Sequence, residues 1–281
     1  MKKILAAALS AVLLMTVGLA GCGQANKDAK YVILDEPLAD EEYVIGFRKT
    51  DVALKEEVNK ILSDLKVDGS LGEISTKWFG SDVTTVSETY EKAETTDDSL
   101  QKIKDKGELV LGLDDSFPPM GYRDEDQNIV GFDVDVATKV CEKLGVELKL
   151  QPIKWSSKEV ELDTGNVDCL WNGFTKNDER EEAMSLSVPY MTNRQVVVTM
   201  DSKGVSSLAD LEGKELVVQG GSTAVDALNE HPEVKDTLKD GRATEVDDNV
   251  TALLDLKTSS AAAVLMDEVV ARYYINTLSA K

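Results

Sequence analysis

The chain has 281 residues, 42% hydrophobic and 30% charged, so it is long enough for one large domain or for two lobes with buried cores. Its 31 Lys and Arg against 52 Asp and Glu give a formal net charge of −21. A surface this acidic repels phosphate backbones, which argues against nucleic acid as a partner. His231 is the only histidine, and no Cys/His cluster has metal-ligand spacing, so a histidine-dependent triad and a zinc site are poorly supported.

The first residues predict export. Two lysines precede an apolar run, residues 4–17, and the small residues that follow are typical of a signal peptide cleavage site. The segment Leu-Ala-Gly-Cys at residues 19–22 resembles a bacterial lipobox, which implies cleavage after residue 21 and a lipid on the Cys22 sulfur. Residues 22–30 would then tether the protein to the membrane, because two or more acyl chains anchor stably. A plain transmembrane anchor or an uncleaved signal is the alternative.

The next part of the chain predicts one strand followed by two helices. Residues 43–48 (YVIGFR) predict the strand, apolar spacing over residues 51–64 predicts the first helix, and residues 69–79 predict a turn and the second helix. Residues 85–98 are acidic and almost without apolar side chains, so we expect an exposed and mobile linker there.

From Leu100 onward, strands and helices alternate. The patterns predict strands at residues 108–113, 146–150, 167–171, 195–200, 214–219 and 262–266, and helices at 132–144, 224–229, 249–256 and 268–277. This alternation predicts an α/β fold with mostly parallel sheets and ligand contacts at the carboxyl ends of strands. Cys141 falls in a predicted helix and Cys169 in a predicted buried strand. These settings favour free thiols, although a disulfide remains open.

Residues 131–198 hold the most informative motif, which begins GFDVDV and continues CLWNGFTKNDER. The predicted strand at 167–171 leads into a polar loop, residues 172–175, and Arg180 follows near the start of a helix. A hydroxyl, backbone N–H groups and a guanidinium around one point suit a carboxylate. In GGST, residues 220–223, glycines and a helix N-terminus would present further N–H groups to an anion.

These stretches closely resemble polar amino-acid substrate-binding proteins, the extracytoplasmic receptors of ABC importers. The resemblance implies a two-lobed α/β fold of the periplasmic-binding-protein-like type II class, with the ligand cleft between the lobes. It implies a ligand-binding set drawn from separate segments: Asp114, Phe117, Trp155, Asn172, Gly173, Thr175, Arg180, Ser222, Thr223 and Asp267.

Within this set, the resemblance implies that Arg180 pairs with the ligand carboxylate and that Asp267 accepts from the ligand ammonium. Thr175 and the 220–223 segment would add donors to the carboxylate. Asp114, with the aromatic side chains of Phe117 and Trp155, would face the ligand side chain. Ordinary turns, helix N-caps and core aromatics are the structural alternatives for these residues.

The order of segments differs from the family order, in which a strand, two helices and a Trp-Phe ending lie at the C-terminus. Here residues 31–84 carry that pattern and precede the usual family beginning at GELVLGLDDSFPP. We therefore expect a circular permutation, with lobe one made of residues 44–84 and 99–190 and lobe two of residues 31–43 and 191–281. The linker, residues 85–98, would join the old ends, and residues 41–45 and 190–195 would form the hinge. A fragment of a tandem or misassembled gene is the alternative, and the sequence leaves open whether a permutation is natural or engineered.

The resemblance implies a lipid-anchored extracytoplasmic monomer that delivers a polar amino acid to an ABC permease, without a cofactor, a metal or enzyme activity. Asp114 and Asp115 favour a cationic or neutral polar ligand, because no Lys or Arg stands at an evident side-chain-facing position. Amino-acid dehydratases share the fold, so an enzyme with Asp114 as acid or base is one alternative. A ligand-sensing module is another. The identity of the amino acid, its affinity and the permease stay open.

Overall fold

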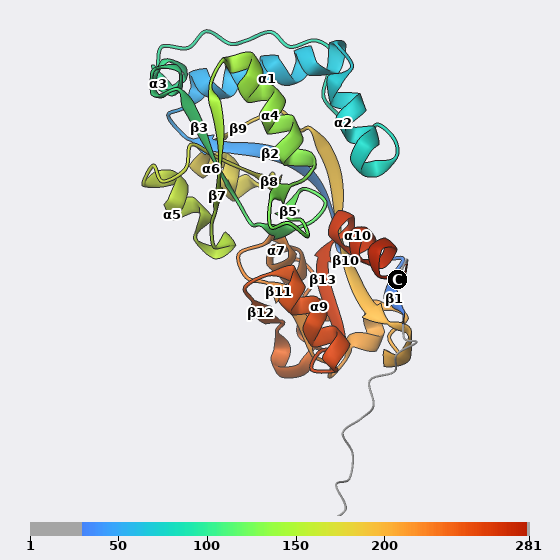
Figure 1. Ribbon diagram of the computed structural model, residues 1–281. Helices are drawn as coiled ribbons and strands as arrows, with labels where there is room; N and C mark the ends of the chain where they lie inside the picture. Colours follow the sequence, from blue (N-terminus) through green and yellow to red (C-terminus); the bar gives the residue numbers. More distant parts are fainter. Residues whose placement is uncertain (1–29, 280–281) are drawn as a thin grey trace, which may run out of the picture.

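The computed structural model describes residues 30–279, which form two α/β lobes connected by two long strands (Figure 1). The predicted signal peptide and Cys22 lie outside these residues, as does most of the tether, and so does Lys281. No helix within the described range is long and apolar enough to cross a membrane.

Lobe one is built on a mixed sheet whose strands follow the order β9-β2-β8-β3-β7, with β3 parallel to β7 and β8, and β2 antiparallel to β8 and β9. The strands are β2 (Ala39–Arg48), β3 (Glu108–Leu113), β7 (Glu147–Pro152), β8 (Cys169–Thr175) and β9 (Met184–Leu186). A small sheet adds β4 (Ser116–Phe117), β5 (Gly121–Arg123) and β6 (Ile129–Val130). The helices are α1 (Val52–Val67), α2 (Ser70–Phe79), α3 (Ser99–Lys106), α4 (Phe132–Leu144), α5 (Lys158–Asp163) and α6 (Asp178–Ala183), with a 3₁₀ turn η1 (Trp155–Ser157).

Lobe two repeats this plan with the strand order β12-β11-β13-β10-β1, in which only β11, β12 and β13 are parallel. Its strands are β1 (Tyr31–Ile33), β10 (Met191–Met200), β11 (Leu216–Gln219), β12 (Thr244–Val246) and β13 (Ala263–Asp267). Its helices are α7 (Thr223–Asn229), α8 (Pro232–Lys235), α9 (Asn249–Thr258) and α10 (Glu268–Ser279), with 3₁₀ turns at Asp201–Lys203, Leu208–Leu211 and Lys239–Gly241. The expectation of mostly parallel sheets is therefore wrong for the strands next to the hinge.

Strands β2 and β10 carry the connection between the lobes. Their antiparallel register runs from Met191 opposite Tyr43 to Gln195 opposite Ala39. Beyond this shared ladder, the rest of β2 pairs with β8 and β9 in lobe one, and the rest of β10 pairs with β13 and β1 in lobe two. The sequence predicted a hinge from parts of these two strands.

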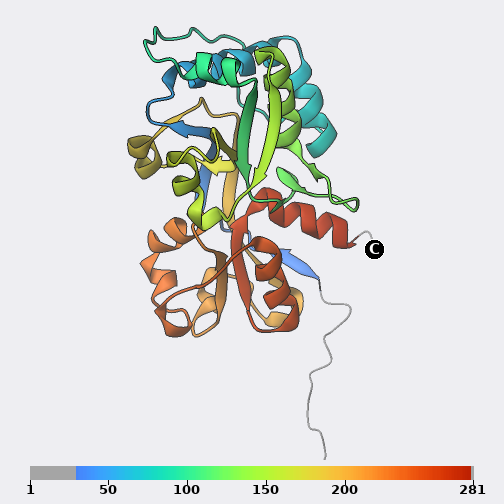
Figure 2. The ribbon, with the colours of Figure 1, turned by 60° about the vertical axis from the view of Figure 1, so that its left-hand side comes forward.

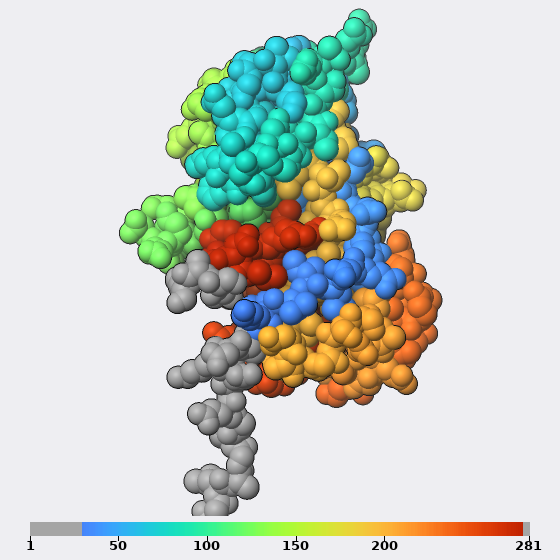
Figure 3. Space-filling view, turned by 90° about the vertical axis from the view of Figure 1, so that its right-hand side faces the viewer, coloured from blue at the N-terminus to red at the C-terminus, as the bar shows by residue number. Residues whose placement is uncertain are grey.

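The N-terminal segment is part of both lobes rather than a separate unit. In lobe one, β2 lies one strand away from β3, and α1 and α2 pack against α4. In lobe two, β1 is an edge strand, and α10 lies beside it in both ribbon views (Figures 1 and 2). The space-filling view from the hinge side shows α10, in red, directly against the blue N-terminal strands (Figure 3). The two ends of the described chain therefore meet on one lobe.

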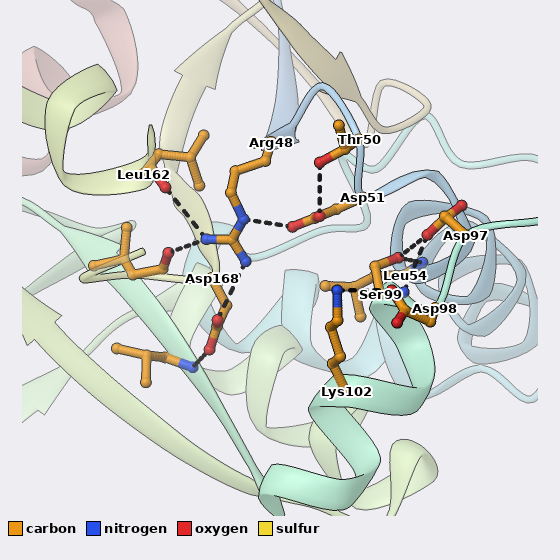
Figure 4. A network of polar contacts seen from close by, with 12 residues as sticks. Arg48, Thr50, Asp51, Leu54, Asp97, Asp98, Ser99, Lys102, Leu162 and Asp168 are labelled. Atoms are coloured by element: carbon orange, nitrogen blue, oxygen red, sulfur yellow. Dashed lines mark hydrogen bonds and ion pairs between the residues drawn. The ribbon is translucent and has the colours of Figure 1, made fainter. Parts of the chain in front are cut away.

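A polar network fastens the end of β2 to the rest of lobe one (Figure 4). Arg48 pairs with Asp51 at 2.7 Å and donates to the Val167 carbonyl at 2.7 Å. The same guanidinium lies 3.4 Å from Asp168, whose carboxylate also accepts the backbone N–H of Val110. Because this arginine bridges groups more than a hundred residues away in sequence, the N-terminal segment and β8 form one structural unit.

The linker, residues 85–98, runs over the outer surface of lobe one along α1, and most of its side chains are exposed as expected. Val86 is nevertheless buried, and the Tyr90 hydroxyl donates to Glu56 of α1 at 2.8 Å. Near its end, Asp97 accepts a backbone N–H from the first turn of α1 at 2.9 Å. The linker is therefore exposed as expected, and hydrogen bonds attach it to α1.

The two cysteines of the described chain, Cys141 and Cys169, are free and buried. Burial raises the pKa of both thiols, which keeps them protonated and unreactive at neutral pH.

Candidate functional site

A small cavity lies where the two lobes meet. Ten residues line it: Phe117, Trp155, Asn172, Gly173, Thr175, Arg180, Gln219, Ser222, Thr223 and Asp267. Nine of these belong to the predicted set, and the tenth predicted residue, Asp114, lies just behind, accepting a hydrogen bond from Gln219 Nε2 at 2.7 Å. The cavity volume is about 10 Å³, which is room for about one water molecule. Segments far apart in sequence thus meet at one point, with the lobes closed on each other.

Arg180 supplies the positive end of the cavity. Helix α6 holds it there through an N-cap, in which Asn177 Oδ1 accepts the Arg180 N–H at 2.9 Å. Its guanidinium is buried over the Phe174 ring, 4.2 Å from the ring centroid, and Nη1 donates to the Thr175 carbonyl. In the described part of the chain, no carboxylate lies within salt-bridge distance of this guanidinium. A buried cation without an ion-pair partner is costly, so this end of the cavity favours an anion.

Strand β8 extends further than the sequence predicted. Residues 172–175, expected as a polar loop, are its last four residues, and all are buried. The Gly173 N–H, expected to face a ligand, donates instead to Asp133 at 2.8 Å. Gly173 itself has φ +57, and a Cβ there would approach the Phe117 ring to 2.8 Å. Glycine is therefore required at this position by backbone conformation and by space.

Asp267 supplies the negative end. Its Oδ1 accepts from the Tyr43 hydroxyl at 2.6 Å and from Asn193 Nδ2 at 2.8 Å. Burial, followed by the neighbouring Glu41 carboxylate, raises the pKa of Asp267 to about 7. The sequence interpretation did not include these three neighbours. To predict this cluster from sequence, one would need to know which side chains of β2 and β10 face inward and also how the two strands pair.

The two lobes contact each other through hydroxyls at the 220–223 segment. Thr223 Oγ1 lies 3.3 Å from Thr175 Oγ1 across the cavity and donates to Glu41. The Ser222 hydroxyl donates to the Gln219 carbonyl at 2.7 Å, within its own lobe. Of the two predicted hydroxyls from lobe two, Thr223 therefore meets lobe one directly, while Ser222 lines the cavity with its hydroxyl turned back to β11.

The aromatic wall lies on the lobe-one side and carries a lysine that the sequence interpretation missed. Trp155 packs edge-on against Phe174 at 6.0 Å between ring centroids. Lys158 Nζ lies 5.4 Å from the centroid of the Trp155 ring and donates to the Gly221 carbonyl of lobe two at 2.8 Å. Lys158 lines a neighbouring pocket rather than the cavity itself, so it places a basic side chain close to the site without entering it.

Asp114 and Asp115 are neighbours in sequence but lie in different environments. Asp114 is buried, accepts from the N–H and hydroxyl of Ser116, and has a pKa raised by burial. Asp115 pairs instead with Arg123 at 2.5 Å, outside the cavity. Of the two acids, Asp114 alone therefore carries the acidic character of this wall.

The sequence pattern of the bacterial extracellular solute-binding proteins, family 3, matches residues 109–269, more than half of the chain. The chain belongs to this family. Its two lobes have the periplasmic-binding-protein type II fold. A substrate-binding protein of an ABC uptake transporter from Streptococcus pneumoniae, solved with bound histidine, superposes with a TM-score of 0.64 and 37% identity over 66% of this chain and 76% of that one.

Two curated relatives differ in function. The L-cystine-binding protein TcyJ of Escherichia coli K12 is 31% identical over 61% of this chain and 63% of its own length, so the chain spans less than two thirds of that relative. Cyclohexadienyl dehydratase of Pseudomonas aeruginosa is 28% identical over 62% of this chain and 64% of its own length. The family resemblance thus extends to binding proteins and to an enzyme.

Within the described chain, no group of three or more His, Cys, Asp or Glu side chains has the arrangement of a metal site.

Proposed function

We propose that the cavity between the lobes binds a polar α-amino acid, and that the protein delivers it to an ABC permease from outside the cytoplasm. The observation that carries this proposal is the polarity of the cavity. A buried, unpaired Arg180 stands at one end and the buried carboxylate of Asp267 at the other. This arrangement is complementary to a zwitterion, whose carboxylate fits a guanidinium fork and whose ammonium fits a carboxylate.

The binding cycle follows from the hinge. The closed cavity is too small for an amino acid, so the lobes must rotate apart about β2 and β10 to admit one. The ligand carboxylate would then meet Arg180 and Thr175 of lobe one, and closure would add Thr223 and Asp267 of lobe two. Contacts that form only after closure shift the population toward the closed state.

A thermal-shift screen of the twenty amino acids tests the proposal, because a ligand that binds only the native state raises the melting temperature. At least one polar amino acid at millimolar concentration should raise it by several degrees, and the d-enantiomer should have a smaller effect. A flat response to all twenty would reject amino-acid binding as the function.

We predict that cationic amino acids bind more tightly than acidic ones, because the buried Asp114 lies at the wall expected to face the ligand side chain. Asp114→Asn should reduce the ratio of arginine to glutamate affinity about tenfold, measured by calorimetry. Asp115→Asn is the matched control, since Asp115 pairs with Arg123 outside the cavity. Glutamate as the best wild-type ligand would contradict the prediction.

The dehydratase relative makes an enzyme the second candidate. Asp114 is the acid that the sequence interpretation assigned to it, but in the closed structure its oxygens are occupied by donors from Ser116 and Gln219. We therefore infer capture without chemistry, in which a bound amino acid is recovered unchanged after prolonged incubation. Recovery of a dehydrated product would favour the enzyme.

Lipid anchoring is part of the proposed function and rests on the Leu-Ala-Gly-Cys segment alone. Cys22→Ser in the full-length protein should release it from membranes or leave its precursor uncleaved, because the lipid attaches to that sulfur. Fractionation and mass spectrometry of the N-terminus measure both effects. Wild-type processing together with full membrane retention in the variant would reject the lipobox.

We also propose that the chain is a circularly permuted member of its family, with the lobe boundaries given by the sequence, and that it acts as a monomer. Two observations support the permutation. The family pattern begins only at residue 109, although residues 39–48 form a central strand of the same sheet. In addition, β1 and α10 lie side by side. This is expected if β1 follows α10 in the family order and the permutation has placed the chain termini between them.

A further inference from the structure

A second buried carboxylate, Glu41, lies beside Asp267 but does not itself line the cavity. A single amide nitrogen, Asn193 Nδ2, donates to Glu41 Oε2 and to Asp267 Oδ1, each at 2.8 Å. Both carboxylates are at least nine-tenths buried. Two carboxylates held this close in a buried site resist being ionised together.

The groups around this carboxylate pair, Glu41 and Asp267, offer few donors and little compensating charge. Arg180 of α6 is attracted to both carboxylates, although Glu159 and Asp226 attract it more strongly. From β2 itself, the Tyr43 hydroxyl donates to Asp267. The other hydrogen-bond partners are uncharged: Asn193 and Gln195 of β10, Thr223 of α7 and, through Thr223, Thr175 of β8. On its other side Glu41 lines a pocket that carries Asp40, Glu42, Arg194, Glu268 and Arg272, and both of these arginines pair with Glu268.

An unused acceptor lies in the same cluster. Gln195 donates through Nε2 to Glu41 Oε2 at 3.0 Å, and its own Oε1 is completely buried without a hydrogen-bond partner among the described residues. The cluster therefore has more acceptors than donors, which disfavours two negative charges in it. An α-ammonium that reaches Asp267, the member of the cluster that lines the cavity, would bring three donors and a positive charge.

We propose that Glu41 is a specificity-determining residue whose negative charge makes Asp267 hold a proton until the ammonium group of the ligand replaces that proton. When the ammonium binds, the proton leaves Asp267 for solvent, and the ammonium compensates the charge of the Asp267 carboxylate in its place. No bond in the ligand breaks or forms. This inference rests on the proposed function, because it assigns the ammonium of an amino acid to this end of the cavity.

The pH dependence has a definite sign. Because the pKa of Asp267 is raised to about 7 without ligand and an adjacent cation must lower it, binding releases protons below neutral pH. Affinity for ligand should therefore rise with pH by up to about tenfold per unit below pH 7 and level off above it. l-Arginine is a suitable probe, since none of its own groups titrates between pH 5.5 and 7.5.

The test is calorimetry with l-arginine at pH 6.0 in two buffers of different ionisation enthalpy, because the buffer dependence of the heat counts the protons released. We expect the wild-type protein to release roughly 0.5 to 1 proton for each arginine bound, and Glu41→Gln to release close to none. Glu42→Gln is the matched control, since Glu42 is the next residue on β2 and is exposed; it should match wild type. Wild-type binding with a buffer-independent heat would overturn the proposal.

Carboxyl ¹³C titration of the unliganded protein separates this inference from the proposed function, since it needs no ligand. One carboxyl, assigned by its loss in Asp267→Asn, should titrate near pH 7, and its midpoint should fall by at least one pH unit in Glu41→Gln. If the Asp267 carboxyl titrates near pH 4, it holds no proton for an ammonium to replace, whether or not amino acids bind. If the titration is as expected and no amino acid binds, the proposed function fails instead.

Discussion

Replacing Arg180 by alanine should weaken amino-acid binding by roughly 2–5 kcal/mol, about 30-fold to several thousand-fold. The guanidinium is the one buried cation at the positive end of the cavity that the described residues leave without an ion-pair partner. Its loss would leave the ligand carboxylate buried without a counter-charge. It would also remove a positive charge that attracts Asp267 and Glu41.

Arg180→Lys should recover only part of this loss, because an ammonium cannot make the two parallel hydrogen bonds of a guanidinium. Arg242→Ala is the matched control, since Arg242 is exposed on lobe two and should bind like wild type. Circular dichroism and melting temperature establish that Arg180→Ala is folded. A folded Arg180→Ala variant whose calorimetric affinity stays within a factor of two of wild type would mean that the carboxylate binds elsewhere.

Deleting residues 31–79 should abolish folding, which is the largest effect expected in this protein. The deletion removes β2 from between β10 and β8, and with it the ladder that connects the lobes. It also removes α1, whose Leu54, Val58 and Leu62 are completely buried in the core of lobe one. Each such side chain contributes roughly 1.5–3 kcal/mol by burial, against a typical total stability of about 5–15 kcal/mol.

A second variant distinguishes this explanation from a general intolerance of rearrangement. It carries the same residues in the family order, with residues 31–84 moved behind residue 281, where α10 already lies beside β1. We expect it to fold and to bind the same amino acid. The loss of cooperative thermal unfolding in the deletion, and its retention in the reordered chain, would support the permutation. A deletion variant that still unfolds cooperatively and binds ligand would refute it.

Helix α4 illustrates what local sequence can predict. Its bounds, Phe132–Leu144, agree with the prediction because apolar side chains recur at helical spacing and glycines stand at both ends. The predicted strands at 108–113 and 262–266 also correspond closely to β3 and β13. In these segments the local pattern and the tertiary environment favour the same structure.

The last residues of β8 illustrate where local sequence misleads. Asn172 and Thr175 have the composition of a loop, because buried polar groups need partners and the neighbouring residues offer none. The partners come from elsewhere: Asn172 Oδ1 accepts the Asp114 N–H at 3.0 Å, and Thr175 meets Thr223 of the other lobe. Glu41 was missed for the same reason. It is one of three acids in the run Ala-Asp-Glu-Glu, and nothing in the local sequence indicates that pairing with β10 will bury this one.

Calorimetry with an amino acid and its decarboxylated amine tests the central claim most directly, namely that the cavity recognises the zwitterionic head of an amino acid. l-Arginine and agmatine share a side chain and differ in the carboxylate that Arg180 is proposed to hold. Arginine should bind at least a hundred times more tightly than agmatine to the wild-type protein, and Arg180→Ala should reduce this ratio to below ten. Equal binding of arginine and agmatine by the wild-type protein would contradict the claim.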